Sequence, residues 1–236
     1  MNRHYLLPHV HLSVVNNSGI LLDLKKGDYI GLSPAQVRAL GSVIQGWPSL
    51  PSGSDSPHPE QIGALVDTLM KRGLVTGIAS LGKPAIPVSM HAARTQLVDR
   101  DSMESPRIRP GHALTLLWSC AYVKLSLRAR PLGAIIRAVE ARKARALGHD
   151  CTDLDTARDL VHVFLRLRPW FYSCRDQCLF DSLVLTTFLA HYRLFPTWVI
   201  GVKTDPFAAH SWVQLEGYVL NDRPGRIQSF APIVAA

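Results

Sequence analysis

A cysteine, a histidine and an aspartate near the end of the chain are spaced in a way that suits nucleophilic catalysis. Cys178 is followed by His210 after 31 residues and by Asp222 after a further 11. A thiolate needs a base that takes its proton and later protonates a leaving amine, and histidine does both near neutral pH. An aspartate that accepts the imidazole N–H fixes the tautomer. We therefore predict Cys178 as nucleophile, His210 as base and Asp222 as orienting group.

Local patterns indicate which elements carry these residues. The apolar run LFDSLVLTTFLAHY predicts a helix from Cys178 to about Tyr192, so the thiol lies where unpaired N–H groups and the helix dipole favour thiolate. Two β-type runs follow, 197–202 and 210–215, with a loop between them. We expect His210 to open its strand and Asp222 to end the next, so that the two meet.

Each residue also has a purely structural interpretation. A buried cysteine on an apolar helix is usually inert, a strand histidine can be a core residue, and Asp222 can belong to a turn. Their joint spacing favours the catalytic interpretation. Cys174 is the rival nucleophile, but it precedes the helix, and His191 lies about 20 Å along the helix from Cys178. Asp176 and Asp181 are expected as supporting polar groups.

The first 32 residues predict a three-stranded meander over 9–15, 20–24 and 28–32, with Asn and Gly-rich turns. Ser33-Pro34 predicts the start of a helix through Ile44. A loop of Pro, Ser and Gly over 48–59 precedes a second helix from about Pro59 to Lys71, and the short apolar pair Leu74-Val75 follows. We expect a small α+β domain over 1–85.

Prolines and charged residues predict a linker over 86–111, and a second domain over 112–236. The second domain should begin with a helix from about Ala113 that is interrupted at Pro131, then a basic helix from Leu132 to about Leu147 and a helix capped by Asp155. The net charge of +8 comes mainly from this middle region. Its cations, between Arg128 and Arg145, are interpreted as a solvated helix face, because no nucleic-acid motif accompanies them.

Composition narrows the remaining classes. The longest apolar stretch, 113–127, is too short to span a bilayer and carries Lys124, and no secretion signal is visible, so we expect a cytoplasmic protein with no membrane or nucleic-acid partner. Four cysteines at 120, 151, 174 and 178 would stay reduced there. Cys174 and Cys178 lack a second paired cluster, so no metal site is predicted.

Two resemblances add to this interpretation. The order of elements in the first domain, with LLDLKKGDYIGLSP at its centre, resembles the small winged-helix domains that recognise leader peptides, the PqqD-like family. The segments CLFDSLVL and FAAHSWVQLEGYVLND, with the spacing given above, resemble lasso-peptide B proteins, which are leader peptidases of a transglutaminase-like and papain-like type. Where that family is expected to have His-Ala-Trp-Val-Glu, this chain has HSWVQ, which leaves His210 and Trp212 intact.

The resemblances imply a function for both domains. The second would hydrolyse the bond between leader and core of a lasso precursor with Cys178, His210 and Asp222, and would need no cofactor for that step. An asparagine-synthetase-like cyclase as partner, and any dependence on ATP, are implied by resemblance alone. The leader would add to the strand 28–32, beside a helix. Its binding residues would be Asp28, Tyr29, Ile30, Gly31, Leu32, Ile62, Leu65 and Leu69.

Two other functions remain open at this point. The same triad could transfer the acyl group to an amine instead of water, which would make the protein an acyltransferase. A leader-binding protein with an inactive site is the other alternative.

Overall fold

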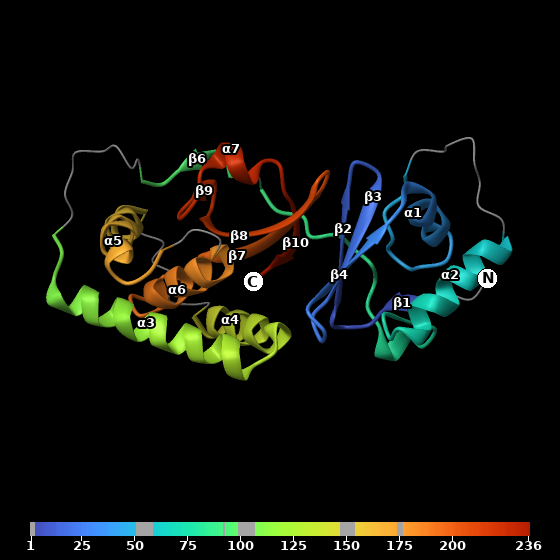
Figure 1. Ribbon diagram of the computed structural model, residues 1–236, viewed down its shortest axis with the longest axis horizontal. Coiled ribbons are helices and arrows are strands. Elements are labelled where there is room, and N and C mark those ends of the chain that lie inside the picture. The colour runs from blue at the N-terminus through green and yellow to red at the C-terminus, as the bar shows by residue number, and fades with distance from the viewer. Residues whose placement is uncertain (1–2, 51–58, 92, 99–106, 147–153, 174–176) are drawn as a thin grey trace. The chain divides into compact units, whose positions relative to one another are not determined.

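The computed structural model describes residues 3–50, 59–91, 93–98, 107–146, 154–173 and 177–236 (Figure 1). It forms two compact units. The first comprises Met1–Ser89 with Val202–Ala208 and Ala231–Val234, and the second comprises Met90–Gly201 with Ala209–Phe230 and Ala235–Ala236. Helices and strands occur throughout, so the predicted mixed α+β class is confirmed.

The first unit contains the predicted three-stranded meander. Strands β2 (Val10–Val15), β3 (Ser18–Asp23) and β4 (Asp28–Leu32) pair antiparallel in the order β2-β3-β4. Asn16 and Asn17 turn β2 into β3 with φ of 48° and 65°, the left-handed conformation that a two-residue hairpin needs and that asparagine tolerates. Among the described residues β3 is the only strand that pairs with β4, so β4 has a free edge.

Helix α1 (Pro34–Gly41) begins at a reciprocal cap. The Ser33 hydroxyl accepts a hydrogen bond from the Gln36 amide at 3.3 Å, and the Gln36 side chain accepts one from the Ser33 amide at 2.9 Å. The helix ends three residues before the predicted Ile44, because Ile44 leaves it to form a β-bridge with His4.

Helix α2 (Pro59–Lys71) has the predicted bounds. Strand β5 (Val75–Thr76) follows and pairs antiparallel with β1 (Tyr5–Leu6), a two-stranded ribbon that sequence reasoning did not foresee. A short 3-10 turn, η1 (Ala79–Leu81), comes next. Both helices and both sheets of this unit contribute side chains to one apolar core, which includes Leu6, Leu12, Leu21, Val37, Leu40, Val66 and Leu74.

In the second unit, one buried helix packs against other helices. Helix α6 (Cys178–Ala190) packs against α3 (Pro110–Ala129) and α5 (Leu154–Leu167), and α3 also packs against α4 (Leu132–Ala146) (Figure 1). Every residue of α6 from 181 to 189 is buried, as expected of a helix that is apolar on all sides. The break between α3 and α4 falls at Pro131, as predicted.

A five-stranded sheet has the order β10-β7-β8-β9-β6, and four of its strands follow α6 in the chain whereas β6 precedes α3. Its strands are β6 (Thr95–Gln96), β7 (Thr197–Thr204), β8 (Phe207–Leu215), β9 (Tyr218–Val219) and β10 (Ala231–Ala235). A short 3-10 turn η2 (Arg168–Trp170) precedes α6, and the four-residue helix α7 (Pro224–Ile227) lies between β9 and β10.

Three expectations differ from the structure. The loop expected over 203–209 is mostly strand, because β7 and β8 continue into a tight turn. Strand β6, inside the segment 86–111 expected as linker, pairs parallel with β9. Asp155 lies within the first turn of α5 and is not its cap, because the helix already begins at Leu154.

Candidate active site

Cys178 is the first residue of α6, the position predicted for it. Its N-cap, Gln177, makes no side-chain hydrogen bond to the helix, so the N–H groups of the first turn are not satisfied by that side chain. The thiol is half-buried and belongs to no disulfide. The backbone N–H groups of Leu179 and Ser211 donate hydrogen bonds to its sulfur, which favours the thiolate.

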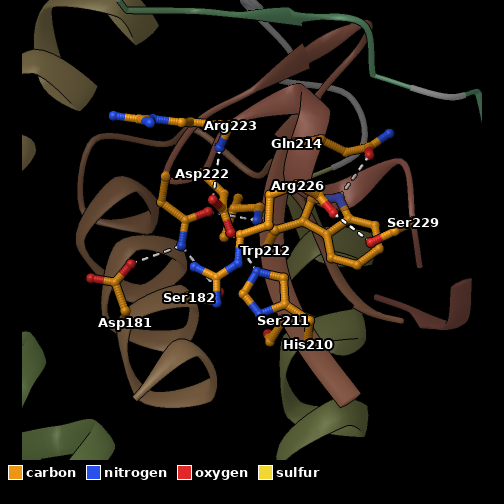
Figure 2. Close-up of polar contacts among 12 residues, drawn as sticks. Asp181, Ser182, His210, Ser211, Trp212, Gln214, Asp222, Arg223, Arg226 and Ser229 are labelled. Atoms are coloured by element: carbon orange, nitrogen blue, oxygen red, sulfur yellow. Dashed lines mark hydrogen bonds and ion pairs between the residues drawn. The ribbon is translucent and has the colours of Figure 1, made fainter. Parts of the chain in front are cut away.

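His210 and Asp222 meet beside this cysteine. Nε2 of His210 donates a hydrogen bond to Oδ2 of Asp222, and both side chains are largely buried (Figure 2). A second hydrogen bond joins the imidazole to the Cys178 thiol, and Nδ1 is the ring nitrogen left for it. The structure therefore brings the three predicted residues together, in the chain Cys178, His210, Asp222.

Two details of this placement differ from the sequence prediction. His210 lies inside β8, three residues after its start at Phe207. Asp222 does not end a strand: it lies three residues after the end of β9, in the loop before α7.

Hydrogen bonding sets the charges of the triad. Burial opposes a charged imidazole, but the hydrogen bonds to Asp222 and to Cys178 outweigh it and raise the pKa of His210 to about 9. The hydrogen bond from His210 lowers the pKa of the Cys178 thiol against the opposing effect of burial. Burial also opposes ionisation of Asp222, yet hydrogen bonds from His210 and the Arg223 amide hold the pKa of its carboxyl below the ordinary value. The shifts of Cys178 and His210 both favour a thiolate beside an imidazolium.

Aromatic rings fix the plane of the imidazole. The His210 ring lies 6.3 Å from Trp212 in a stacked arrangement and 5.2 Å from Phe230. Trp212 is buried because Gly201 of the neighbouring strand β7 leaves room for its indole. A third ring, Trp198, donates from Nε1 to the Ser211 hydroxyl at 2.8 Å, next to the base.

The loop that carries Asp222 is held by polar contacts. The Arg223 amide donates to Oδ1 of Asp222 at 2.7 Å (Figure 2). Gln96 of β6 donates from its side-chain amide to the Asp222 carbonyl at 2.8 Å. One carboxylate oxygen of Asp222 therefore accepts from His210, and the other accepts from an amide of its own loop.

A cleft of about 380 Å³ opens over the triad, enough for part of an extended peptide. Several of the residues that line the cleft are charged. The lining residues are Arg168, Cys178, Asp181, His210, Ser211, Asn221, Asp222, Arg223 and Arg226.

Asp181 is a supporting residue, as predicted, and it is 4% exposed. Nη1 of Arg168 donates to both of its carboxylate oxygens, at 2.9 and 3.0 Å, and the Tyr172 hydroxyl donates at 2.9 Å. Asn221 donates from Nδ2 to the same carboxylate at 2.8 Å. These hydrogen bonds take the place of the water that the buried carboxylate loses on folding.

The competing residues lie elsewhere or outside the described part of the chain. His191 follows the end of α6 and contacts Trp118 edge-on, at 4.8 Å between ring centroids. Cys120 lies on α3, where burial raises the pKa of its thiol to about 11. Cys151, Cys174 and Asp176 fall outside the described residues.

The described residues contain no group of three or more His, Cys, Asp or Glu side chains arranged to hold a metal ion. Among the helices described, none combines the length and the apolar character needed to cross a bilayer.

The residues predicted to bind a leader fall into two groups. Leu32 and Leu69 are 4% and 2% exposed and belong to the core of the first unit, so their side chains are not available to a ligand. The others reach the surface to different degrees: Asp28 and Gly31 are exposed, and Tyr29, Ile30, Ile62 and Leu65 are partly buried.

Sequence reasoning missed several residues that complete the site. Asn221 directly precedes Asp222, and this adjacency is the one feature of the sequence that could have pointed to it. Gln96 and Arg168 are 126 and 13 residues from the groups they bind, and no local pattern connects them. The remaining additions are Ser211, Arg223, Arg226 and Phe230, which touch the triad or line its cleft.

Comparisons with known proteins give a family match and one curated relative. Residues 119–235 match the transglutaminase-like superfamily. A 50-residue segment is 42% identical to the microcin J25-processing protein McjB of Escherichia coli. That match covers 21% of this chain and 24% of the relative, so the chain aligns with about a quarter of the length of the curated relative. No solved structure matches the chain.

Proposed function

We propose that this chain is a cysteine peptidase that removes the leader from a lasso-peptide precursor. The match of residues 119–235 to the transglutaminase-like superfamily supports this proposal. The observation that carries the proposal is the hydrogen-bonded chain from Cys178 through His210 to Asp222, at the floor of one cleft. The name of the curated relative, a processing protein for microcin J25, supports a precursor peptide as the substrate.

In the proposed reaction the Cys178 thiolate attacks the carbonyl carbon of the bond between leader and core. The tetrahedral oxyanion is stabilised by backbone N–H groups at the start of α6, which the helix leaves without internal partners. The C–N bond breaks as the imidazolium of His210 gives its proton to the leaving amine. Neutral His210 then takes a proton from water, whose oxygen displaces the thiolate and releases the leader acid.

The first unit is the proposed leader-binding module, of the PqqD-like winged-helix type. The free edge of β4 supports this role, because an extended peptide can pair its main chain with an edge strand. Asp28 and Gly31 are exposed along that strand, and Ile62 and Leu65 on α2 offer partly exposed apolar surface. Tethering such a module to the peptidase would raise the local concentration of the cleavage site.

The wider pathway is part of the same proposal. The freed core amine would pass to an asparagine-synthetase-like cyclase, and any requirement for ATP would belong to that collaboration, because the triad itself needs no cofactor. We place the reaction in the cytoplasm, where Cys178 would stay reduced.

The direct test is cleavage of a lasso-precursor peptide, followed by mass spectrometry. We expect the wild-type protein to release leader and core as two free peptides. Cys178→Ala and His210→Ala should abolish cleavage, whereas the matched variant Cys120→Ala, which alters a thiol outside the cleft, should retain it. Asp222→Asn should lose up to about 10⁴-fold, because an amide facing Nε2 favours the wrong imidazole tautomer.

The products separate the alternatives. A leader joined to an added amine instead of a free acid would assign the site to acyl transfer. Cleavage by Cys178→Ala at the wild-type rate would overturn the proposed nucleophile. A precursor that binds but is never processed, under conditions in which Cys178 reacts with a thiol probe, would leave only a binding role.

A further inference from the structure

The proposed chemistry uses three side chains, and it leaves unexplained a fourth polar residue, Asn221, that is 8% exposed and lies next to Asp222. All of its side-chain polar atoms have partners within the site. Nδ2 donates to Oδ2 of Asp181 at 2.8 Å and lies 3.1 Å from the Ser182 hydroxyl oxygen, while Oδ1 accepts from the Val213 amide at 2.9 Å. Figure 2 shows Asp181 and Ser182 on the helix that faces Asp222.

These partners belong to the elements that carry the other catalytic groups. Asp181 and Ser182 lie three and four residues after Cys178 on α6. Val213 lies three residues after His210 on β8. A single side chain therefore connects the helix of the nucleophile, the strand of the base and the loop of the orienting carboxylate.

The contact with β8 replaces a backbone pair. Strand β9 ends at Val219, and the next amide, that of Leu220, still donates to the Val213 carbonyl at 2.9 Å. The Val213 amide has no further strand residue to bind there, and Oδ1 of Asn221 accepts its hydrogen. The loop is thereby held against β8 at the residue before Asp222.

On α6, the Asp181 carboxylate that Asn221 contacts is also held by residues that precede the helix. Arg168 and Tyr172, which precede α6, neutralise and orient the Asp181 carboxylate through three hydrogen bonds. Asn221 links this Asp181 carboxylate to the loop of Asp222, whereas Arg168 and Tyr172 bond the carboxylate from the segment before α6.

We propose that Asn221 is a positioning residue: anchored to Asp181 on α6 and to Val213 on β8, it holds the adjacent Asp222 against His210 and so maintains the hydrogen bond between His210 and Cys178. The inference rests on the proposed role of Cys178 and His210, but not on the identity of the substrate. Asn221 itself takes no part in bond making.

The experiment measures the titration of Cys178 without a substrate. Full-length protein is treated with limiting iodoacetamide across pH 4–10, and mass spectrometry follows alkylation of the Cys178 peptide. Wild-type protein should react with a midpoint well below the value of about 8.5 for a free thiol. Asn221→Ala should move the midpoint upward toward that value, and the rate below both midpoints should fall about tenfold for each pH unit of the shift.

Tyr172→Phe is the matched control, because it also removes one hydrogen bond to Asp181 but not the link to the triad. A purely structural role would give both variants a lower melting temperature and the same midpoint as wild type. The positioning role requires that Asn221→Ala move the midpoint and Tyr172→Phe leave it in place.

A second variant provides the same test in case Asn221→Ala does not fold. In Asn221→Ser the hydroxyl is about 1 Å shorter than the amide it replaces and falls short of both the Val213 amide and the Asp181 carboxylate, so its midpoint should rise as well. An unmoved midpoint in folded Asn221→Ala or Asn221→Ser would overturn the proposal, as would failure of both variants to fold, which would make Asn221 a structural residue. A wild-type midpoint near 8.5 would instead refute the pairing of Cys178 with His210.

Discussion

Gly201 on β7 lies against the indole ring of Trp212 on β8. A Cβ atom at Gly201 would stand 2.6 Å from two ring carbons of Trp212 and 3.1 Å from Cβ of Phe230, the two rings that flank His210. Gly201→Ala should therefore displace these rings and lower the free energy of unfolding by about 1–3 kcal/mol, as measured by urea denaturation. Gly217→Ala, where no described atom lies within 4 Å of the new Cβ, is the control and should change it little.

Arg168 and Asp181 form a buried ion pair, with side chains 8% and 5% exposed. Arg168→Met should cost about 3–5 kcal/mol, because it leaves the Asp181 carboxylate buried without its cation. Arg158→Met breaks a pair with Asp155 of similar length, 2.7 Å, on the surface, and should cost no more than about 1 kcal/mol. Chemical denaturation of both variants tests the contrast; equal losses would mean that the buried pair contributes no more than a surface one.

The pH dependence of cleavage should follow the charges of the triad. The reactive form needs thiolate at Cys178 and a proton on His210. Because the pKa of the thiol is lowered, activity should persist below the ordinary range of a cysteine and decline only when that thiolate is protonated. Because the pKa of His210 is raised to about 9, activity should fall as pH rises through 9.

The profile of kcat/KM against pH measures both limits. A basic limb near pH 6.5, the value of an unperturbed imidazole, would contradict the hydrogen bonds assigned to His210. Buffer ions can be excluded as the cause by repeating the profile at constant ionic strength.

Leader binding should depend on the main chain of β4. Successive residues of a strand direct their N–H groups to opposite edges, so one of Ile30 and Gly31 donates toward β3 and the other toward the free edge. Proline at the residue that faces the free edge should keep the fold, as judged by circular dichroism, and weaken leader affinity. Fluorescence anisotropy with labelled leader measures the affinity of full-length Ile30→Pro and Gly31→Pro. Unchanged affinity in both folded variants would exclude strand addition at β4.

Local chemistry made much of this fold predictable. The Ser33-Pro34 start, the two asparagines between β2 and β3 and the break at Pro131 are each decided by neighbouring residues, and all three occur as expected. The proximity of Cys178, His210 and Asp222 was also predicted, because a helix followed by two short strands leaves few ways to arrange them.

Contacts between distant residues were not predictable in the same way. Gln96 reaches the Asp222 carbonyl from 126 residues away, and β6 joins the sheet from a segment whose prolines and charges indicate a linker. The exact place of Asp222 depended on β9 having only two residues, and such a strand leaves no periodic signal. Burial of Leu32 and Leu69 likewise depends on how two elements pack against each other, and the sequence of either element alone does not determine this.

The pairing of β6 with β9 decides where this gene can be divided. A bicistronic version, with the two halves made as separate polypeptides, would have to break the chain before Thr95 so that β6 stays with the half that carries Cys178. A break at residue 111, the boundary that composition favours, would give β6 and Gln96 to the other half and remove the hydrogen bond that Gln96 makes to the Asp222 carbonyl. Strand β6, which precedes α3, therefore has to stay on the same polypeptide as Cys178, His210 and Asp222.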